Sequence, residues 1–152
     1  MYTREESSSI RQEFWTIFGK YMSPVLSSGG LRVNWINYKT GIKDVHFRMD
    51  ALAGSASISI SMEHGDAGIR ELFLEQFLEL RLMLHESLQE EWDWQRDVLV
   101  NGKMVSRIVK ELPETSVFNK EQWPELISFF KPRIVALDGF WEDAKYSFET
   151  LR

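Results

Sequence analysis

The stretch DVHFRMDALAGSASISISMEH, residues 44–64, decides the fold of this chain. Apolar and polar residues alternate on both sides of its middle, which is the period-two pattern of β-strands with one buried face. The middle, LAGS at residues 52–55, has the small residues of a turn. We therefore predict a β-hairpin with strands over residues 44–51 and 56–64.

The register of this hairpin follows from the same alternation. Both apolar sets must lie on one side of the sheet, because a slip of one residue turns every side chain to the other face. A four-residue loop achieves this, whereas a three-residue loop would place Met49 opposite Ser57. The predicted pairs are Ala51–Ala56, Met49–Ile58, Phe47–Ile60 and Val45–Met62 on the apolar face, and Asp50–Ser57, Arg48–Ser59, His46–Ser61 and Asp44–Glu63 on the polar face.

Further elements flank the hairpin on both sides. A capping box at Thr3–Glu6 starts a first helix, and the β-branched and aromatic residues of 31–38 predict a strand. A long amphipathic helix is expected over 66–92, followed by a second hairpin, 97–100 and 103–109, around the type I′ turn pair Asn101-Gly102. A last helix begins near the cap Asn119 and is kinked or split by Pro132.

These elements predict one α+β domain over residues 1–152. The order α-β-β-β-α-β-β-α implies a mainly antiparallel sheet covered by helices. Its core should hold Phe47, Met49, Ile58 and Ile60 beneath the long helix, with Phe73 and Phe77 above them. The excess of aromatic residues suggests a homodimer through an exposed patch. The tryptophans considered for that patch are Trp35, Trp92, Trp94 and Trp141.

Composition narrows the classes of protein. The chain has no cysteine, which excludes disulfides and thiolate metal sites. It has neither a signal-peptide pattern nor a long apolar run, so we expect a cytoplasmic protein with no membrane partner. The net charge of −5 is uneven: residues 32–50 carry four basic and two acidic residues, whereas residues 63–97 carry ten acidic residues and three arginines. This balance disfavours broad nucleic-acid binding but leaves room for a local contact.

Four segments carry a family resemblance: QEFWTIFGKYMSP, NWINYKTGIKDVHFRMDA, NKEQWPELISFFKPRIVALDGFW and KYSFE. Together they resemble the bacterial family known as domain of unknown function 4268, over nearly the whole chain. The resemblance implies no catalytic residue, because none is established for the family. It also implies occurrence both as short proteins and behind nuclease-like domains in longer chains, which suggests a nucleic-acid-related system.

The order of the first six expected elements matches the core of restriction-endonuclease-like folds, in which carboxylates bind Mg²⁺ or Mn²⁺. Asp44 and Glu63 lie opposite each other in the predicted register and are the candidate metal ligands, with Glu13 as a third acid. Asp50 would lie about 20 Å from Glu63 along a straight strand. The lysine expected two residues after Glu63 is Gly65, so His64 or Lys43 would have to replace it. The alternative is that Asp44 and Glu63 are an exposed pair of acids without a ligand, and that Lys43 reduces the repulsion between them.

Two hypotheses of function follow. The first is a non-enzymatic interaction module without a cofactor, which self-associates or binds a protein or nucleic-acid partner. The second is a metal-dependent nuclease-like protein, or its decayed descendant, with Mg²⁺ or Mn²⁺. We prefer the first, because the motif lysine is missing and the chain is acidic.

Overall fold

The computed structural model describes residues 2–151, and it has the predicted α+β architecture. Residues 1 and 152 of the predicted domain lie outside the described part. The sheet is antiparallel, with strand order β1-β2-β4-β3. The elements in chain order are α1 (Arg4–Met22), β1 (Val45–Ala51), β2 (Ser55–Met62), α2 (Ala67–Glu79), α3 (Arg81–Leu88), β3 (Asp93–Val100), β4 (Lys103–Pro113), the 3-10 turn Lys120–Gln122, α4 (Trp123–Ala144) and the 3-10 segment Lys145–Leu151.

The first hairpin forms in the predicted register. Every predicted pair from Val45–Met62 to Ala51–Ala56 is present in the ladder between β1 and β2. The Glu63 amide donates to the carbonyl of Asp44 at 2.7 Å, so the outermost predicted pair also meets through its backbone. At the other end, Leu52 donates to the carbonyl of Ser55 at 2.9 Å and closes the loop. The period-two pattern was therefore sufficient to predict the pairing of this hairpin.

The second hairpin turns at Asn101-Gly102, where both residues have positive φ, 51° and 78°. Positive φ at both central positions is the requirement of a type I′ turn, as predicted. Both strands are longer than predicted, and the β3–β4 register shifts between Gln95 and Val98. This bulge left no signal in the sequence.

The predicted strand over 31–38 is wrong, because these residues form turns without a strand. Asn34 accepts a hydrogen bond from the Asn37 amide at 3.2 Å, which offers the backbone a local alternative to a sheet. The buried indole of Trp35 donates to the carbonyl of Val25, and the Tyr38 hydroxyl donates to Asp138 on α4. Tyr38 thus anchors the loop onto α4, whereas Trp35 ties it to the segment that follows α1.

The predicted long helix is two helices. Residue Leu80, with φ −97° and ψ 11°, ends α2 and starts α3, and Gln89 ends α3 in the left-handed conformation. The prediction failed here because the apolar spacing continues through the bend. By contrast, α4 is continuous from Trp123 to Ala144 despite Pro132, so the predicted split does not occur. Asn119 caps the 3-10 turn that precedes α4, accepting from the Glu121 amide.

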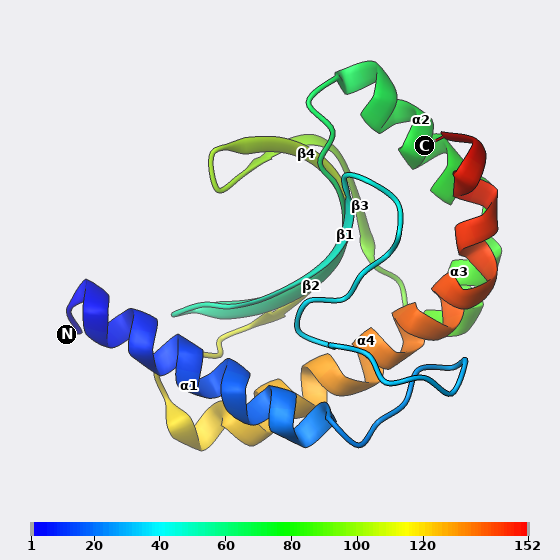
Figure 1. Ribbon diagram of the computed structural model, residues 1–152. Helices are drawn as coiled ribbons and strands as arrows, with labels where there is room; N and C mark the ends of the chain where they lie inside the picture. The colour runs from blue at the N-terminus through cyan, green and yellow to red at the C-terminus, as the bar shows by residue number, and fades with distance from the viewer. Residues whose placement is uncertain (1, 152) are drawn as a thin grey trace.

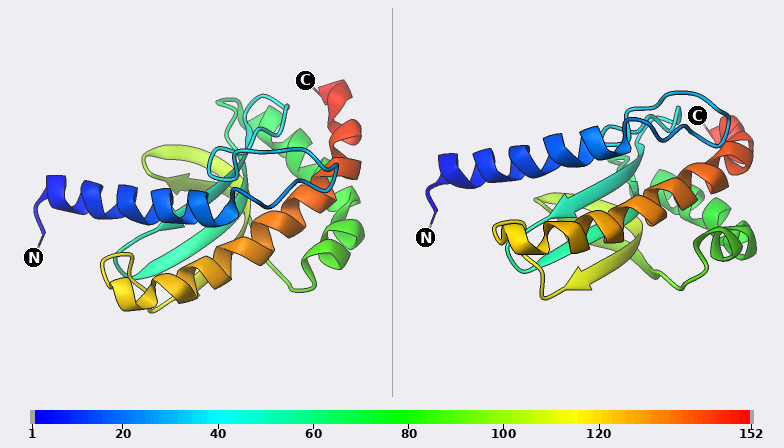
Figure 2. Two further views of the ribbon diagram at one scale, coloured as in Figure 1. Left: turned by 60° about the horizontal axis from the view of Figure 1, so that its bottom comes forward. Right: turned by 90° about the horizontal axis from the view of Figure 1, so that it is seen from below.

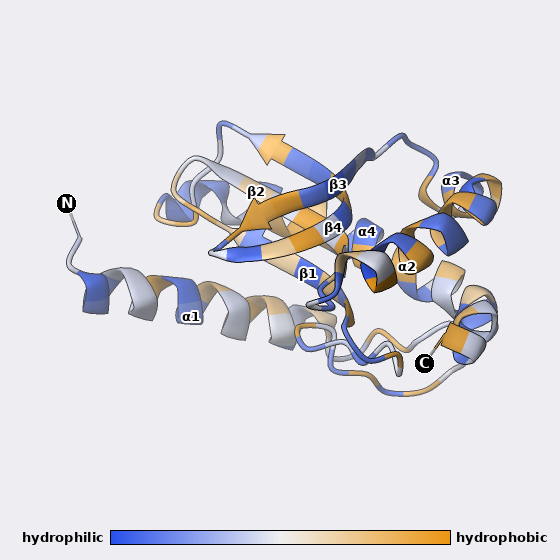
Figure 3. Cartoon of the chain, turned by 90° about the horizontal axis from the view of Figure 1, so that it is seen from above, coloured by the Kyte–Doolittle hydropathy of each residue, from blue (hydrophilic) through white to orange (hydrophobic). Residues whose placement is uncertain are grey.

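The helices share one side of a strongly curved sheet (Figure 1). α2, α3 and α4 follow its convex face, and α1 runs beside α4, with Phe14 and Phe18 against Phe130 (Figure 2). Along the strands, hydrophobic and hydrophilic residues alternate (Figure 3). The apolar set of β2 lies in the buried core with residues of α4, and no helix or strand within residues 2–151 covers the concave face.

The core is close to the predicted one, with two corrections. Phe47, Ile58 and Ile60 are buried, whereas Met49 is only partly buried. Phe47 meets the ring of Trp141 on α4, so α4 covers this part of the sheet where the long helix was expected. Trp35, Trp92 and Trp141, considered for an exposed patch, are buried within the chain.

Candidate ligand-binding groove

The concave face of the sheet holds a cavity of about 280 Å³. Its lining comes from β1, β2, β4 and the tip of the second hairpin, and none of it belongs to the apolar core beneath the helices. The lining residues are Arg48, Asp50, Ser59, Ser61, Glu63, Val100, Asn101, Lys103, Val105 and Arg107. We call this cavity the concave groove. Five of these residues carry a charged side chain, which makes it a candidate site for a polar ligand.

The floor of the concave groove is shielded although no helix covers it. Ser59 and Ser61 are each 4% exposed, and Val105 beside them is 3% exposed. The curvature of the sheet crowds side chains on the inner face, and small residues such as serine fit there. The floor therefore offers hydroxyl groups next to an apolar wall, in surroundings with restricted access to water.

One carboxylate of the groove is held by two cations. Arg48 donates to both oxygens of Glu63 at 2.9 Å, and Lys103 reaches the same carboxylate at 3.5 Å. Burial alone would raise the pKa of Glu63, but the hydrogen bonds from Arg48 and Ser61 more than offset it and lower the pKa to about 2. Glu63 is therefore anionic at neutral pH, and it orders Arg48 and Lys103 along the rim.

The second carboxylate has a different environment. Burial raises the pKa of Asp50, and the positive charges of Arg48 and Arg107 offset only part of this rise. Within residues 2–151, no hydrogen bond or ion pair links the Asp50 carboxylate to another side chain or to the backbone. Arg107 donates to Gln95 at 2.7 Å and leaves Asp50 available. The Asp50 carboxylate is thus available to accept a hydrogen bond from a ligand in the groove.

His46 lies on the same face of β1, two residues before Arg48. Burial and the positive charge of Arg48 lower the pKa of His46, in spite of Glu63 and Asp44 nearby. The imidazole is therefore neutral at pH 7, and it adds no positive charge to this face.

Of the acids selected from sequence, only Glu63 lines the groove. Asp44 occupies a left-handed turn, with φ 66°, and does not line the groove, while the carboxylate of Glu63 is directed to Arg48. Glu13 on α1 is paired with Lys120 at 3.1 Å. In the part of the chain that the structure describes, no three His, Cys, Asp or Glu side chains gather in a way that could hold a metal ion.

The two basic candidates have separate environments as well. The Nδ1 atom of His64 accepts a hydrogen bond from the Asp66 amide at 2.9 Å, which fixes the turn before α2. Lys43 is exposed in the loop before β1. The structure therefore brings only Asp44 and Glu63 of the five candidates together, and does so through their backbone.

Sequence reasoning missed most of the groove. The predicted register already placed Arg48 and Asp50 beside the serines, and this was the available signal. Lys103 and Arg107 could not be found in this way, because their strand pairs with β2 across about 40 residues of intervening chain. A straight strand would separate Asp50 from Glu63 by about 20 Å, yet the curvature brings both into the lining of one cavity.

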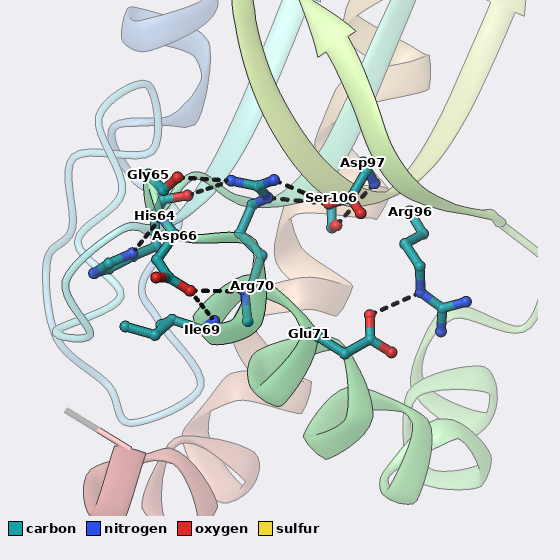
Figure 4. Close-up of polar contacts among 10 residues, drawn as sticks. His64, Gly65, Asp66, Ile69, Arg70, Glu71, Arg96, Asp97 and Ser106 are labelled. Atoms are coloured by element: carbon teal, nitrogen blue, oxygen red, sulfur yellow. Dashed lines mark hydrogen bonds and ion pairs between the residues drawn. The ribbon is translucent and has the colours of Figure 1, made fainter.

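A buried arginine holds the end of β2 to α2 and β3 (Figure 4). Arg70 is 4% exposed and donates to the carbonyls of His64 and Gly65 and to the carboxylate of Asp97, the last at 3.0 Å. Asp97 has a positive φ of 49° within the β3 bulge, and its amide donates to Ser106. This cluster fixes the bulge that bends the outer strand, and so it supports the curvature of the sheet.

The fold and the groove define an α+β protein whose sheet has one face packed in the core and one polar face left open. The chain belongs to the family described as Domain of unknown function (DUF4268), which matches residues 10–145. No curated protein and no solved structure matches the chain. Across the described residues 2–151, no helix combines the length and apolar character needed to cross a bilayer.

Proposed function

We propose that this protein is a non-enzymatic binding module that takes a segment of single-stranded nucleic acid in the concave groove. The observation that carries the proposal is the local charge. The chain as a whole has a net charge of −5, yet Arg48, Lys103 and Arg107 all line one cavity that contains two carboxylates. The three cations against two carboxylates leave the cavity with a net charge of +1 in an acidic chain, and a concave site with a positive balance attracts an anionic ligand.

The chemistry of the lining suits a nucleotide better than a simple anion. Arginine and lysine donate to phosphate oxygens, and the serine hydroxyls of the floor can donate as well. Asp50 accepts hydrogen bonds, and an exocyclic amino group of a base is a donor of the required kind. A single strand exposes the Watson–Crick edges of its bases, which base pairing occupies in a duplex.

The state of Glu63 supports binding over metal-dependent cleavage. Its carboxylate already accepts hydrogen bonds from Arg48 and Lys103, so a divalent cation would have to displace two positive charges. A carboxylate used in this way orients the cationic rim. The protein is therefore proposed to act without a cofactor, and its nucleic-acid ligand is proposed to be met in the cytoplasm.

Self-association is a separate part of the proposal, and it needs another surface than the one expected from the tryptophans. Leu99 and Met104 face each other across β3 and β4 near the hairpin tip, and they are 68% and 44% exposed. An exposed apolar pair at the end of a projecting hairpin can be buried by a second copy. Light scattering across a concentration series would detect the dimer, and loss of the dimer in Leu99→Ser would assign the surface.

Fluorescence anisotropy with a short labelled single-stranded DNA tests the nucleic-acid proposal. We expect the double variant Lys103→Gln/Arg107→Gln to weaken binding by about tenfold or more, and to reduce the salt dependence of log K by roughly 0.7 per lost phosphate contact. The matched control is Lys39→Gln, an exposed lysine outside the groove, which should bind like the wild type. Equal loss in control and groove variants, or no binding by the wild type, would reject the proposal.

A further inference from the structure

A second cavity, of about 350 Å³, lies between α3 and the start of β3. Its walls are mostly apolar: Leu84 and Leu88 come from α3, Trp92 from the connection before β3, Trp94 from β3, and Ile108 from β4. None of these residues lines the concave groove. We call this cavity the α3–β3 pocket.

The tryptophan side of the α3–β3 pocket is fixed in place. The Trp92 side chain is largely buried, and its indole N–H donates to Glu90 at 2.8 Å. Arg133 on α4 donates to both oxygens of the same carboxylate, at 2.8 and 2.9 Å. A pocket whose wall is held by a hydrogen-bonded ion pair is present before any ligand arrives, which lowers the entropic cost of binding.

The mouth of the pocket carries exposed apolar surface. Leu82 lines the pocket and is 78% exposed, the largest exposed fraction among the large hydrophobic residues that the structure describes. The adjacent Met83 is 41% exposed. An exposed leucine beside a tryptophan-lined cavity extends the apolar surface that the side chain of a partner can bury.

The charges around this pocket are mainly acidic. Glu86, Glu91 and Asp93 are all exposed, and none of them forms an ion pair with another residue of the described chain. Glu90 is neutralised by Arg133, and the basic residues nearby are Arg81 in the lining and Lys110 on β4, whose charge acts on Glu90. A partner that brings positive charge next to an apolar side chain would therefore match the pocket and its rim.

We propose that the α3–β3 pocket binds a basic amphipathic segment of a partner protein, with an apolar side chain in the cavity and Lys or Arg opposite Glu91 and Glu86. The volume is suited to one or two large apolar side chains, and the acidic rim selects the sign of their neighbours. This surface is independent of the concave groove, so the protein would join a nucleic-acid strand and a protein partner.

Two model peptides of the same length and apolar content provide the test, one built from Leu and Lys and the other from Leu and Glu. Labelled peptide anisotropy should show that the Leu/Lys peptide binds at least about tenfold more tightly than the Leu/Glu peptide. Leu82→Ser should weaken binding of the Leu/Lys peptide by about fivefold or more. Leu31→Ser, which removes another exposed leucine outside both cavities, should leave binding unchanged.

Charge-reversal variants distinguish specific contacts with the acidic rim of the pocket from general electrostatic attraction between a basic peptide and an acidic protein. Glu91→Lys should narrow the preference between the peptides by about fivefold or more. Glu75→Lys, an equal change of charge at an exposed position of α2 outside the pocket, should preserve the preference. Equal binding of both peptides, or equal effects of the two reversals, would overturn the proposal. If the wild-type protein forms a dimer that excludes the labelled peptide, and Leu82→Ser abolishes this dimer, the pocket binds a second copy of the chain and the proposal is wrong.

Discussion

In the middle of β2, the two faces of the sheet have similar solvent exposure but different neighbours. On β2, Ile58 is fully buried and the adjacent Ser59 is 4% exposed. Ile58 owes its burial to the core beneath the helices, whereas Ser59 owes its shielding to the curvature of the strands around it. Low exposure therefore marks packing on one face and a ligand-sized cavity on the other. A buried polar residue is the more informative of the two observations.

The two faces of the sheet should differ most in how much stability is lost when a side chain is truncated. Ile60→Ala removes buried methyl groups beneath the helices and should lower the free energy of unfolding by about 2–5 kcal/mol. Ser59→Ala, one residue earlier on the concave face, should change it by less than about 1 kcal/mol, because the hydroxyl makes no contact that packs the core. Urea unfolding of both variants measures the contrast. Similar losses would mean that the concave face is also a packed interface.

The second-largest loss of stability should follow substitution of Arg70, the buried arginine that holds the outer strand to α2. Arg70→Met leaves two backbone carbonyls and Asp97 without their donor, and should cost about 1–3 kcal/mol in urea unfolding. Arg96→Met is the matched control, because Arg96 also joins β3 to α2, through Glu71, but is exposed. Its loss should cost about 0–1 kcal/mol. An equal effect of the two variants would show that the Arg70 cluster does not fix the bulge.

The ion pair of the groove should give a smaller effect that depends on pH. The pKa of Glu63 is lowered from 4.5 to about 2. Its stabilisation is therefore complete above pH 4.5 and is lost as pH falls toward 2. Because Arg48 is half-exposed, water screens the pair, and the contribution should be about 1–2 kcal/mol.

Urea unfolding from pH 7 to pH 2 checks this expectation. The stability of Glu63→Gln should fall less than that of the wild type between pH 4.5 and pH 2. Glu13→Gln removes an exposed ion pair on α1 and should keep the wild-type slope. Parallel curves for wild type and Glu63→Gln would contradict the assigned role of Arg48.

The smallest expected effect is that of divalent metal. For a binding module, millimolar Mn²⁺ should leave the melting temperature unchanged, and single- or double-stranded DNA should stay intact. An active metal site would instead stabilise the fold, by about 2.7 kcal/mol at a hundredfold excess over its dissociation constant. A shift lost in Asp44→Asn and kept in Asp50→Asn would favour the nuclease hypothesis with the acids chosen from sequence. A shift lost in Asp50→Asn and kept in Asp44→Asn would instead place the metal site in the concave groove.

Local patterns predicted the elements that depend on neighbours in the chain. The alternation of residues 44–64 gave every pair of the first hairpin, because side-chain direction in a strand has a period of two residues. Asn101-Gly102 gave the second turn, because both positions need positive φ. Thr3 gave the start of α1, since its hydroxyl accepts from the Glu6 amide.

Aromatic content was ambiguous where tertiary contacts decide. The segment 31–38 has the composition of a strand, yet Tyr38 anchors it as a loop to α4 and Trp35 holds it to the carbonyl of Val25. The bend at Leu80 interrupts an apolar pattern that by itself continues. In both places the competing structures have similar local preferences, so packing against distant residues determines the outcome.

The sequence by itself determined which residues share the polar face of the first hairpin, because backbone geometry links their spacing to their direction. Only the tertiary structure decided that this face is concave, that α4 covers the opposite face, and that Lys103 and Arg107 join Arg48 and Asp50 in one cavity. Curvature depends on the bulge at Asp97 and on its contact with Arg70, which are separated from the first hairpin along the chain. The groove is thus a product of pairing between distant strands, whereas the register is a property of a single short stretch.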